Sequence, residues 1–165
     1  TLNEVGLTEE IEETGDTFTE NSLIKARFAH NILNMNTLAD DSGLETEALS
    51  GAPGVFSARY AGKHCSDQMN VDKLLLELSG VSNRKAQFRT VLTLILEGKE
   101  HLFDGTITGS IAHKRQGTNG FGYDPVFIPD GFDKTFAQLP ADTKNQISHR
   151  GEAVRKMVQF LNKSS

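Results

Sequence analysis

The sequence contains little cysteine, no tryptophan and no long hydrophobic run. Because Cys65 is the single cysteine, no internal disulfide can form, and a reducing compartment suits the chain. No apolar stretch approaches the length of a membrane span, and no signal peptide is visible. These absences predict a soluble, cytoplasmic protein that does not enter a membrane.

An excess of positive charge is also missing. The formal net charge is −5, which argues against binding a nucleic-acid backbone by bulk electrostatics, although a small nucleotide could still bind in a local cationic pocket. Apolar and charged residues occur in ordinary proportions, so the chain should fold rather than remain disordered. A length of 165 residues predicts one domain over residues 1–165, with a sizeable core.

The most informative stretch begins with a short apolar run, residues 37–39, that leads into Asp40, Asp41, Ser42 and Gly43. The run predicts a short buried strand, with the carboxylates at the start of a loop. Adjacent carboxylates leaving a strand can hold a hard cation such as magnesium, which polyphosphate substrates require. The same residues also favour an ordinary turn, and the pair alone does not decide between these interpretations.

Helical spacing predicts two helices in the first half of the chain. Thr17 and Glu20 fit a capping box and apolar residues follow at helical spacing, so a helix should run over residues 18–33. The glycine-rich residues 43–62 predict a long, shaped loop. Ser66 can cap the helix that follows this loop.

The clearest hairpin joins residues 87–96 to residues 101–109. Both segments are rich in β-branched and aromatic residues, and a tight turn separates them. Asp104 and Gly105, inside the second segment, suggest a β-bulge.

Residues 117–125 form a second unusual stretch, in which glycines surround Phe121, Tyr123 and Asp124. The stretch matches neither a dinucleotide fingerprint nor a P-loop. Aromatic rings can stack on a purine and an aspartate can accept hydrogen bonds from a base edge, so this is a candidate base-binding loop. A glycine-rich hairpin with core aromatics is the alternative. A short strand is expected next, over residues 126–128.

The C-terminal part combines a basic cluster with a helix. A helix start after Pro140 should bring four polar side chains close together, those of Lys144, Ser148, His149 and Arg150. The terminal helix should bury one apolar face. Its predicted members are Val154, Met157, Val158 and Leu161.

Five blocks of the sequence, taken together, resemble the inosine triphosphate pyrophosphatase family, also described as noncanonical purine NTP pyrophosphatases, dITP/XTP pyrophosphatases or Ham1-like proteins. The blocks occur in the family's order over nearly the whole chain, which makes the match far more specific than any single motif. They are residues 12–15, 18–27, 38–62, 117–125 and 144–151.

The resemblance implies an α/β fold with a long, twisted mixed sheet flanked by helices, in two lobes with the active-site cleft between them. It also implies hydrolysis of ITP, dITP and XTP to the monophosphate and pyrophosphate, with Mg²⁺ as cofactor, which removes deaminated purines from the nucleotide pool. Members of the family are usually homodimers, so a homodimer is expected, with purine nucleoside triphosphates as small-molecule partners.

The family's functional residues can be carried over by position. Asp41 matches the catalytic carboxylate, described as general base and metal ligand. Glu12 matches the second metal ligand, with the adjacent Glu13 as the alternative. Lys25 and Arg59 match basic positions that face the phosphates. The remaining matches are substrate contacts, namely Ser42, Phe121, Gly122, Tyr123, Asp124, Lys144, His149 and Arg150, with Ser148 beside them.

One part of the family pattern is missing. The family begins with a strand, a Thr-Gly-Asn-x-x-Lys loop and a helix, and this sequence contains none of them. The chain is therefore expected to be an N-terminally truncated form of the domain. Two other hypotheses stay open: a catalytically silent nucleotide-binding fragment, and a pyrophosphatase with a different base preference.

Overall fold

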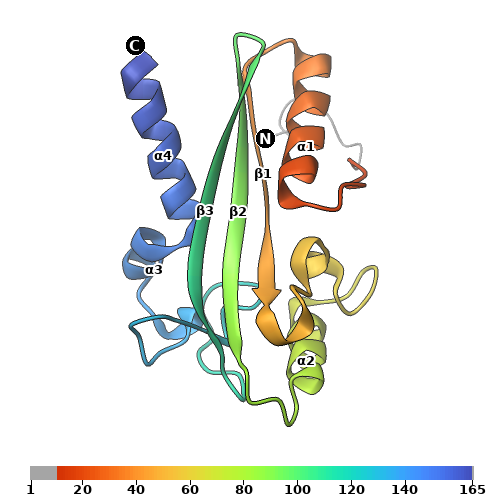
Figure 1. The fold of residues 1–165 in the computed structure, drawn as a ribbon, viewed down its shortest axis with the longest axis vertical. Helices are drawn as coiled ribbons and strands as arrows, with labels where there is room; N and C mark the ends of the chain where they lie inside the picture. Colours follow the sequence, from red (N-terminus) through yellow and green to blue (C-terminus); the bar gives the residue numbers. More distant parts are fainter. Residues whose placement is uncertain (1–10, 165) are drawn as a thin grey trace.

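The computed structural model describes residues 11–164, without the side chain of Ser164. A four-stranded sheet with the order β1-β2-β3-β4 organises this range, and helices flank it (Figure 1). The α/β class agrees with the expectation. All pairings among these strands are antiparallel, so the expected mixed sheet is not found within residues 11–164. The strands are β1 (Thr37–Thr46), β2 (Lys85–Leu96), β3 (Lys99–Ile111) and β4 (Phe127–Pro129).

Helices cover both faces of the sheet (Figure 1). α1 (Phe18–Leu33) contacts β1 and β2, and α4 (His149–Ser164) contacts β3 and β2 from the opposite face. α1 begins at the predicted capping box, in which Thr17 Oγ1 accepts the Glu20 N–H and the Glu20 carboxylate accepts the Thr17 N–H. The predicted bounds of this helix are confirmed. The remaining helices are α2 (Asp67–Glu77), which Ser66 caps as predicted, and α3 (Ala141–Ile147).

The predicted hairpin is confirmed as β2 and β3. Its two-residue turn places Glu97 and Gly98 at positive φ, 51° and 75°, which matches the twist of the flanking strands. The predicted bulge is wrong, because the register runs unbroken through Asp104 and Gly105. Gly105 has a different reason: a Cβ there would overlap the His149 carbonyl oxygen, so the glycine lets α4 approach the strand closely.

Apolar side chains are buried in two clusters. The larger one joins α2 to β1 and β2 and contains Leu44 and Leu74. The smaller one lies between α4 and the sheet and contains Leu92 and Phe103. The two clusters pack on different stretches of β2, the larger one around Phe88 and the smaller one around Leu92 and Leu94.

The buried face of α4 differs in part from the prediction. Met157 and Leu161 pack against the smaller cluster as predicted, and Ala153 is fully buried in it. Val154 and Val158 were expected on the same face, but they are 42% and 45% exposed. They lie one position after Ala153 and Met157, which turns them past the contact with the sheet.

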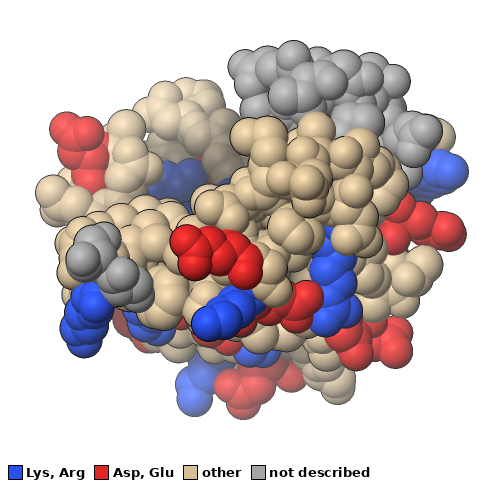
Figure 2. All heavy atoms as spheres, turned by 90° about the horizontal axis from the view of Figure 1, so that it is seen from above, with Lys and Arg blue, Asp and Glu red and all other residues tan. Residues whose placement is uncertain are grey.

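No helix within residues 11–164 is long and apolar enough to cross a membrane. Basic and acidic side chains are interspersed on the face shown in Figure 2. Neither sign forms a continuous patch on that face, so a charged ligand bound there would have to be recognised by local groups.

Candidate active site

The Asp40–Asp41 pair lies inside a strand and not at the start of a loop. β1 pairs with β2 over ten residues, from Thr37 opposite Ile95 to Thr46 opposite Ala86. This pairing overrides the turn preference of the local sequence, so the predicted short strand followed by a loop is wrong here. The long loop begins after Thr46 and contains short 3₁₀ helices. Because successive strand side chains point to opposite faces, the two aspartates belong to different groups of residues.

Asp41 faces α1 and belongs to an acid–base cluster that we define as Glu13, Lys25, Asp41 and Arg59. Lys25 Nζ donates to Asp41 Oδ1 at 2.8 Å and to Glu13 Oε1 at 2.9 Å. Arg59 Nη1 donates to Glu13 Oε2 at 3.3 Å. The structure therefore brings together the predicted catalytic carboxylate and both predicted basic residues.

Burial sets the proton affinities in this cluster. It raises the pKa of Asp41 above the ordinary value, and the Lys25 ammonium offsets only part of this effect. Burial acts on Glu13 in the same direction, but the bonds from Lys25 and Arg59 outweigh it and lower the pKa of Glu13. Burial would lower the pKa of Lys25, yet its bonds to the two carboxylates raise it. Lys25 thus stays charged, and Asp41 is the carboxylate that more readily accepts a proton.

The second carboxylate oxygen of Asp41, Oδ2, is buried and lacks a hydrogen bond of ordinary geometry among the described residues. The nearby Asn21 side chain nevertheless favours the charged form of Asp41 and acts to lower its pKa. No three His, Cys, Asp or Glu side chains within residues 11–164 could hold a metal ion by themselves. Mg²⁺, however, commonly binds through one or two carboxylates, with water and substrate phosphates as its other ligands. Asp41 and Glu13 fit that kind of site.

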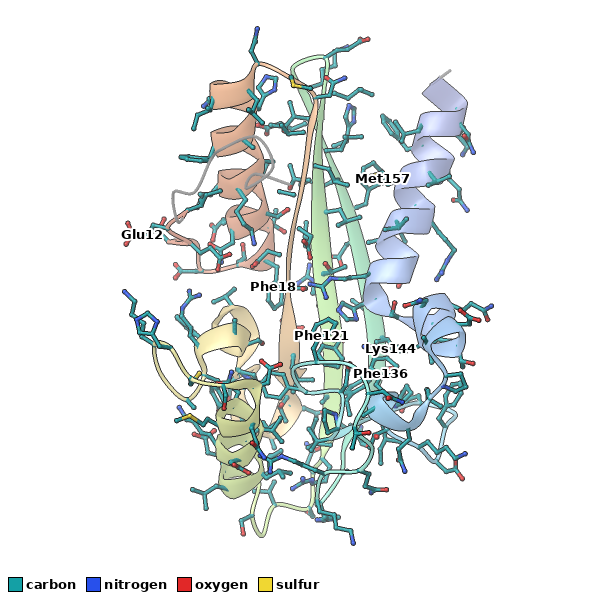
Figure 3. The ribbon with its side chains drawn as sticks, turned by 180° about the vertical axis from the view of Figure 1, so that it is seen from behind. Glu12, Phe18, Phe121, Phe136, Lys144 and Met157 are labelled. Carbon is teal, nitrogen blue, oxygen red and sulfur yellow. The ribbon has the colours of Figure 1, made fainter. Side chains whose placement is uncertain are left out.

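Glu12, the residue first matched to the second metal ligand, lies outside the acid–base cluster. Its side chain is exposed and points away from the sheet (Figure 3). The adjacent Glu13 instead faces Lys25. Neighbouring side chains of a nonhelical segment point in different directions, so only one of the two can approach Asp41. The geometry favours Glu13, the alternative.

The predicted substrate contacts border a single pocket of about 290 Å³. They come from three parts of the chain: β1, the loop before β4, and the segment from α3 to the start of α4. The structure thus gathers residues that are far apart in sequence. The eight residues are Ser42, Phe121, Gly122, Tyr123, Asp124, Lys144, His149 and Arg150, and Ser148 lies beside them.

Phe121 presents its ring to solvent at this pocket, with 63% of the residue exposed. Lys144 Nζ lies 4.7 Å from the ring centroid and the Arg150 guanidinium carbon lies 5.6 Å from it, close enough for cation–π contacts. Figure 3 shows Phe121 and Lys144 beside one another. The buried Asp124 accepts hydrogen bonds from the Phe121 N–H, at 2.9 Å, and from Lys144. One carboxylate therefore holds both the aromatic ring and the cation in place.

Tyr123 has a different environment from Phe121. It is 4% exposed, packs in the larger core cluster and donates its hydroxyl to the Ser57 carbonyl at 2.9 Å. Burial raises the pKa of Tyr123, so the phenol stays protonated. Both interpretations of residues 117–125 therefore hold, each for one aromatic residue. Phe121 faces the pocket, as expected of a base-binding loop, and Tyr123 is a core aromatic that anchors the loop.

His149 is a neutral, buried imidazole. Its ring stacks on Phe88 with centroids 4.9 Å apart, and its Nδ1 has no partner among the described residues. Burial, together with the charges of Arg150 and Lys144, lowers its pKa to about 3. At neutral pH the imidazole therefore offers one donor and one acceptor.

Arg150 connects the pocket to β1. Its Nη2 lies 3.0 Å from Asp40 Oδ2 and 2.8 Å from Ser42 Oγ. The sequence analysis named Asp40 only as a possible cation ligand paired with Asp41, whereas strand alternation turns it to the opposite face, where it accepts from Arg150. The site is thus one strand with the acid–base cluster on one face and the substrate pocket on the other.

These features define an α/β protein whose strand β1 carries an acid–base cluster on one face and borders an aromatic, cationic pocket on the other. The chain belongs to the Ham1 family, whose family model matches residues 1–160. The resemblance found in the sequence is thereby confirmed.

Relatives are similar over nearly the whole chain. A dITP/XTP pyrophosphatase of Porphyromonas gingivalis is 52% identical over 161 residues, covering 97% of this chain and 83% of the relative. The dITP/XTP pyrophosphatase of Bacillus subtilis is 48% identical over 163 residues, covering 97% and 82%. The structure of the Staphylococcus aureus Ham1 protein superposes with a TM-score of 0.95 at 44% identity, covering 99% of this chain and 86% of that one.

Proposed function

We propose that this protein hydrolyses noncanonical purine nucleoside triphosphates, namely dITP, XTP and ITP, to the monophosphate and pyrophosphate. Relatives that share about half of its residues are dITP/XTP pyrophosphatases. The structural observation that carries the proposal is that residues 40–42 of β1 join a base-sized pocket to the acid–base cluster.

The base is assigned to the pocket beside Phe121. The exposed ring of Phe121 supplies a stacking surface. His149, Arg150 and backbone N–H groups supply donors for the 6-oxo group of hypoxanthine or xanthine. Adenine carries an amino group at that position and would leave such donors unpaired, which can reject a substrate strongly.

The triphosphate is assigned to the edge of β1. Within the described residues, β1 pairs with β2 along one edge. The other edge is covered from Leu44 onward, where Glu45 bridges to Pro53 and the N–H groups of Leu44 and Thr46 donate to Ser57 Oγ and the Ala52 carbonyl, but no described strand pairs with it at residues 40–42. A chain of phosphates can therefore pass around the strand to reach Asp41. Lys25 and Arg59 then lie where they can balance the phosphate charge.

The proposed reaction is attack of water at the α-phosphorus, with pyrophosphate as the leaving group. Asp41 accepts the proton of the attacking water, since its raised pKa suits a general base. Asp41 and Glu13 would hold Mg²⁺, which when bound neutralises phosphate charge. A homodimer and a cytoplasmic location belong to the same proposal, the first supported by the family resemblance and the second by the lone cysteine.

The test is pyrophosphate release from dITP, XTP and ITP, against dATP and dGTP, with Mg²⁺ at mildly alkaline pH. Release selective for the first three substrates is expected. Binding of IMP without release would favour the catalytically silent alternative. Preferred turnover of a modified pyrimidine triphosphate would favour the different base preference.

A further inference from the structure

Helix α2 contributes a carboxylate to the loop that carries Phe121. Asp67, the first residue of α2, accepts the Gly122 N–H through its Oδ2 at 2.7 Å. The preceding amide, that of Phe121, donates to Asp124 Oδ2 at 2.9 Å. Two consecutive amides are thus each held by a carboxylate, one from within the loop and one from a helix 55 residues earlier in the chain.

The backbone at Gly122 explains why this position is a glycine. Its φ is +57°, a conformation that residues with a Cβ rarely adopt, and a Cβ there would meet nothing within 4 Å. Space is therefore not the constraint. In this conformation the Gly122 amide faces Asp67, and no other carboxylate of the described residues is bonded to it.

The first turn of α2 is a fixed support for Asp67. Ser66 Oγ accepts the Met69 N–H at 3.3 Å and so caps the helix. Asn70 is buried, and its side-chain amide binds the segment that precedes α2. Its Oδ1 accepts the Ala61 N–H at 2.7 Å, and its Nδ2 donates to the Ala58 carbonyl at 3.2 Å. Because these bonds fix the start of α2, Asp67 has a fixed position and holds the Gly122 amide in place.

We propose that Asp67 is a positioning residue that fixes Phe121 over the substrate pocket and so determines the affinity for the base. The inference rests on the proposed function of this pocket. Phe121 lies between the two held amides, and its exposed ring has Lys144 and Arg150 as its cationic neighbours. Asp67 has no contact with the acid–base cluster among the bonds of the described residues, so its loss should weaken binding more than chemistry.

The test compares Asp67→Ala, Asp67→Asn and the control Asp72→Ala in steady-state turnover of dITP. Asp72 lies on the same helix and pairs with Arg115, so it also links α2 to the segment before the loop. Asp67→Ala should raise KM about five- to tenfold, the effect of losing a charge-assisted hydrogen bond, with kcat within about twofold of the wild type. Asp67→Asn keeps an oxygen acceptor and should recover most of the affinity, and Asp72→Ala should resemble the wild type.

Calorimetric binding of IMP to the same variants separates this inference from the proposed function. The Kd of IMP should rise about five- to tenfold in Asp67→Ala, whether or not the wild type turns over dITP. Unchanged KM and Kd in Asp67→Ala, or equal losses in Asp67→Ala and Asp72→Ala, would overturn the role of Asp67. A wild type that binds IMP but releases no pyrophosphate would overturn the proposed reaction and leave the Kd comparison valid.

Discussion

Asp40 and Asp41 are adjacent in sequence, yet each bonds to a cation on the opposite face of β1. Asp41 Oδ1 accepts from Lys25 of α1, whereas Asp40 Oδ2 accepts from Arg150 of α4. Strand alternation alone produces this division, because consecutive side chains leave a strand on opposite sides. A pair that reads as one acidic motif thus has two separate tasks, one in the acid–base cluster and one beside the substrate pocket.

Lys25→Met should lower the free energy of unfolding by about 1–3 kcal/mol, because Asp41 and Glu13 lose their shared counter-ion in a partly buried cluster. Urea unfolding at neutral pH measures the change. Arg27→Met is the matched control on the same helix, since Arg27 is 55% exposed and its pair with Glu100 should contribute at most about 1 kcal/mol. Equal losses in both variants would contradict the coupling of Lys25 to the two carboxylates.

Glu13→Gln should raise the Mg²⁺ concentration needed for half-maximal activity by about tenfold or more, since a carboxylate ligand is replaced by a weaker amide. Glu12→Gln should leave that concentration near the wild-type value, because Glu12 points away from the site. Titration of activity with MgCl₂ distinguishes the two. A larger effect at Glu12 would restore the first assignment from the sequence.

His149 should make the fold less stable in mild acid. Its folded-state pKa of about 3 lies below the ordinary value of 6.5, so between these values the unfolded chain binds a proton that the folded chain excludes. The contribution of neutral His149 to the free energy of unfolding is complete above pH 6.5. It decreases by about 1.4 kcal/mol per pH unit as the pH falls from 6.5 toward 3. Unfolding free energies at pH 7 and pH 5 should differ by about 2 kcal/mol more in the wild type than in His149→Gln.

His64→Gln serves as the control for this pH dependence, because His64 is exposed. It should keep the wild-type difference between pH 7 and pH 5. If His149→Gln kept that difference as well, the imidazole would not be the group responsible.

Gly105→Ala should destabilise the fold by about 2–4 kcal/mol, since the added Cβ would overlap the His149 carbonyl oxygen and lie 2.8 Å from Ala153 N. Both neighbours are backbone atoms of α4, so the whole helix start has to shift. Gly131→Ala should cost about 1–2 kcal/mol, because it meets no atom within 4 Å and has only the strain of φ +84°. Thermal unfolding of the two variants checks that Gly105→Ala is the more destabilised one. A Gly105→Ala variant more stable than Gly131→Ala would contradict the close packing of α4 on β3.

Local signals in the sequence were sufficient where the structure depends on near neighbours. The Thr17 capping box fixed the start of α1, and the β2–β3 hairpin was found from its composition and turn. Local signals were insufficient where contacts between strands or helices distant in sequence determine the structure. Pairing with β2 extends β1 through Asp40 and Asp41, and the approach of α4 explains Gly105.

The candidate site shows the same limit. Family resemblance selected residues that border one pocket and one cluster, but it did not choose between Glu12 and Glu13, because adjacent residues differ only in their orientation. Asp40 was named only as half of an acidic pair and Asp67 was not named at all, because their partners, Arg150 and Gly122, lie far away in sequence. The roles of the site residues stay predictions.

The most direct measurement is kcat and KM for dITP in Asp41→Asn beside the matched Asp40→Asn. The account predicts that Asp41→Asn lowers kcat by about a thousandfold or more with little change in KM, since the general base is lost while the substrate pocket is intact. Asp40→Asn should keep kcat within about fivefold and mainly raise KM, because Arg150 loses its partner at the pocket. Similar losses in both variants, or a larger loss of kcat in Asp40→Asn, would contradict the division of tasks between the two faces of β1.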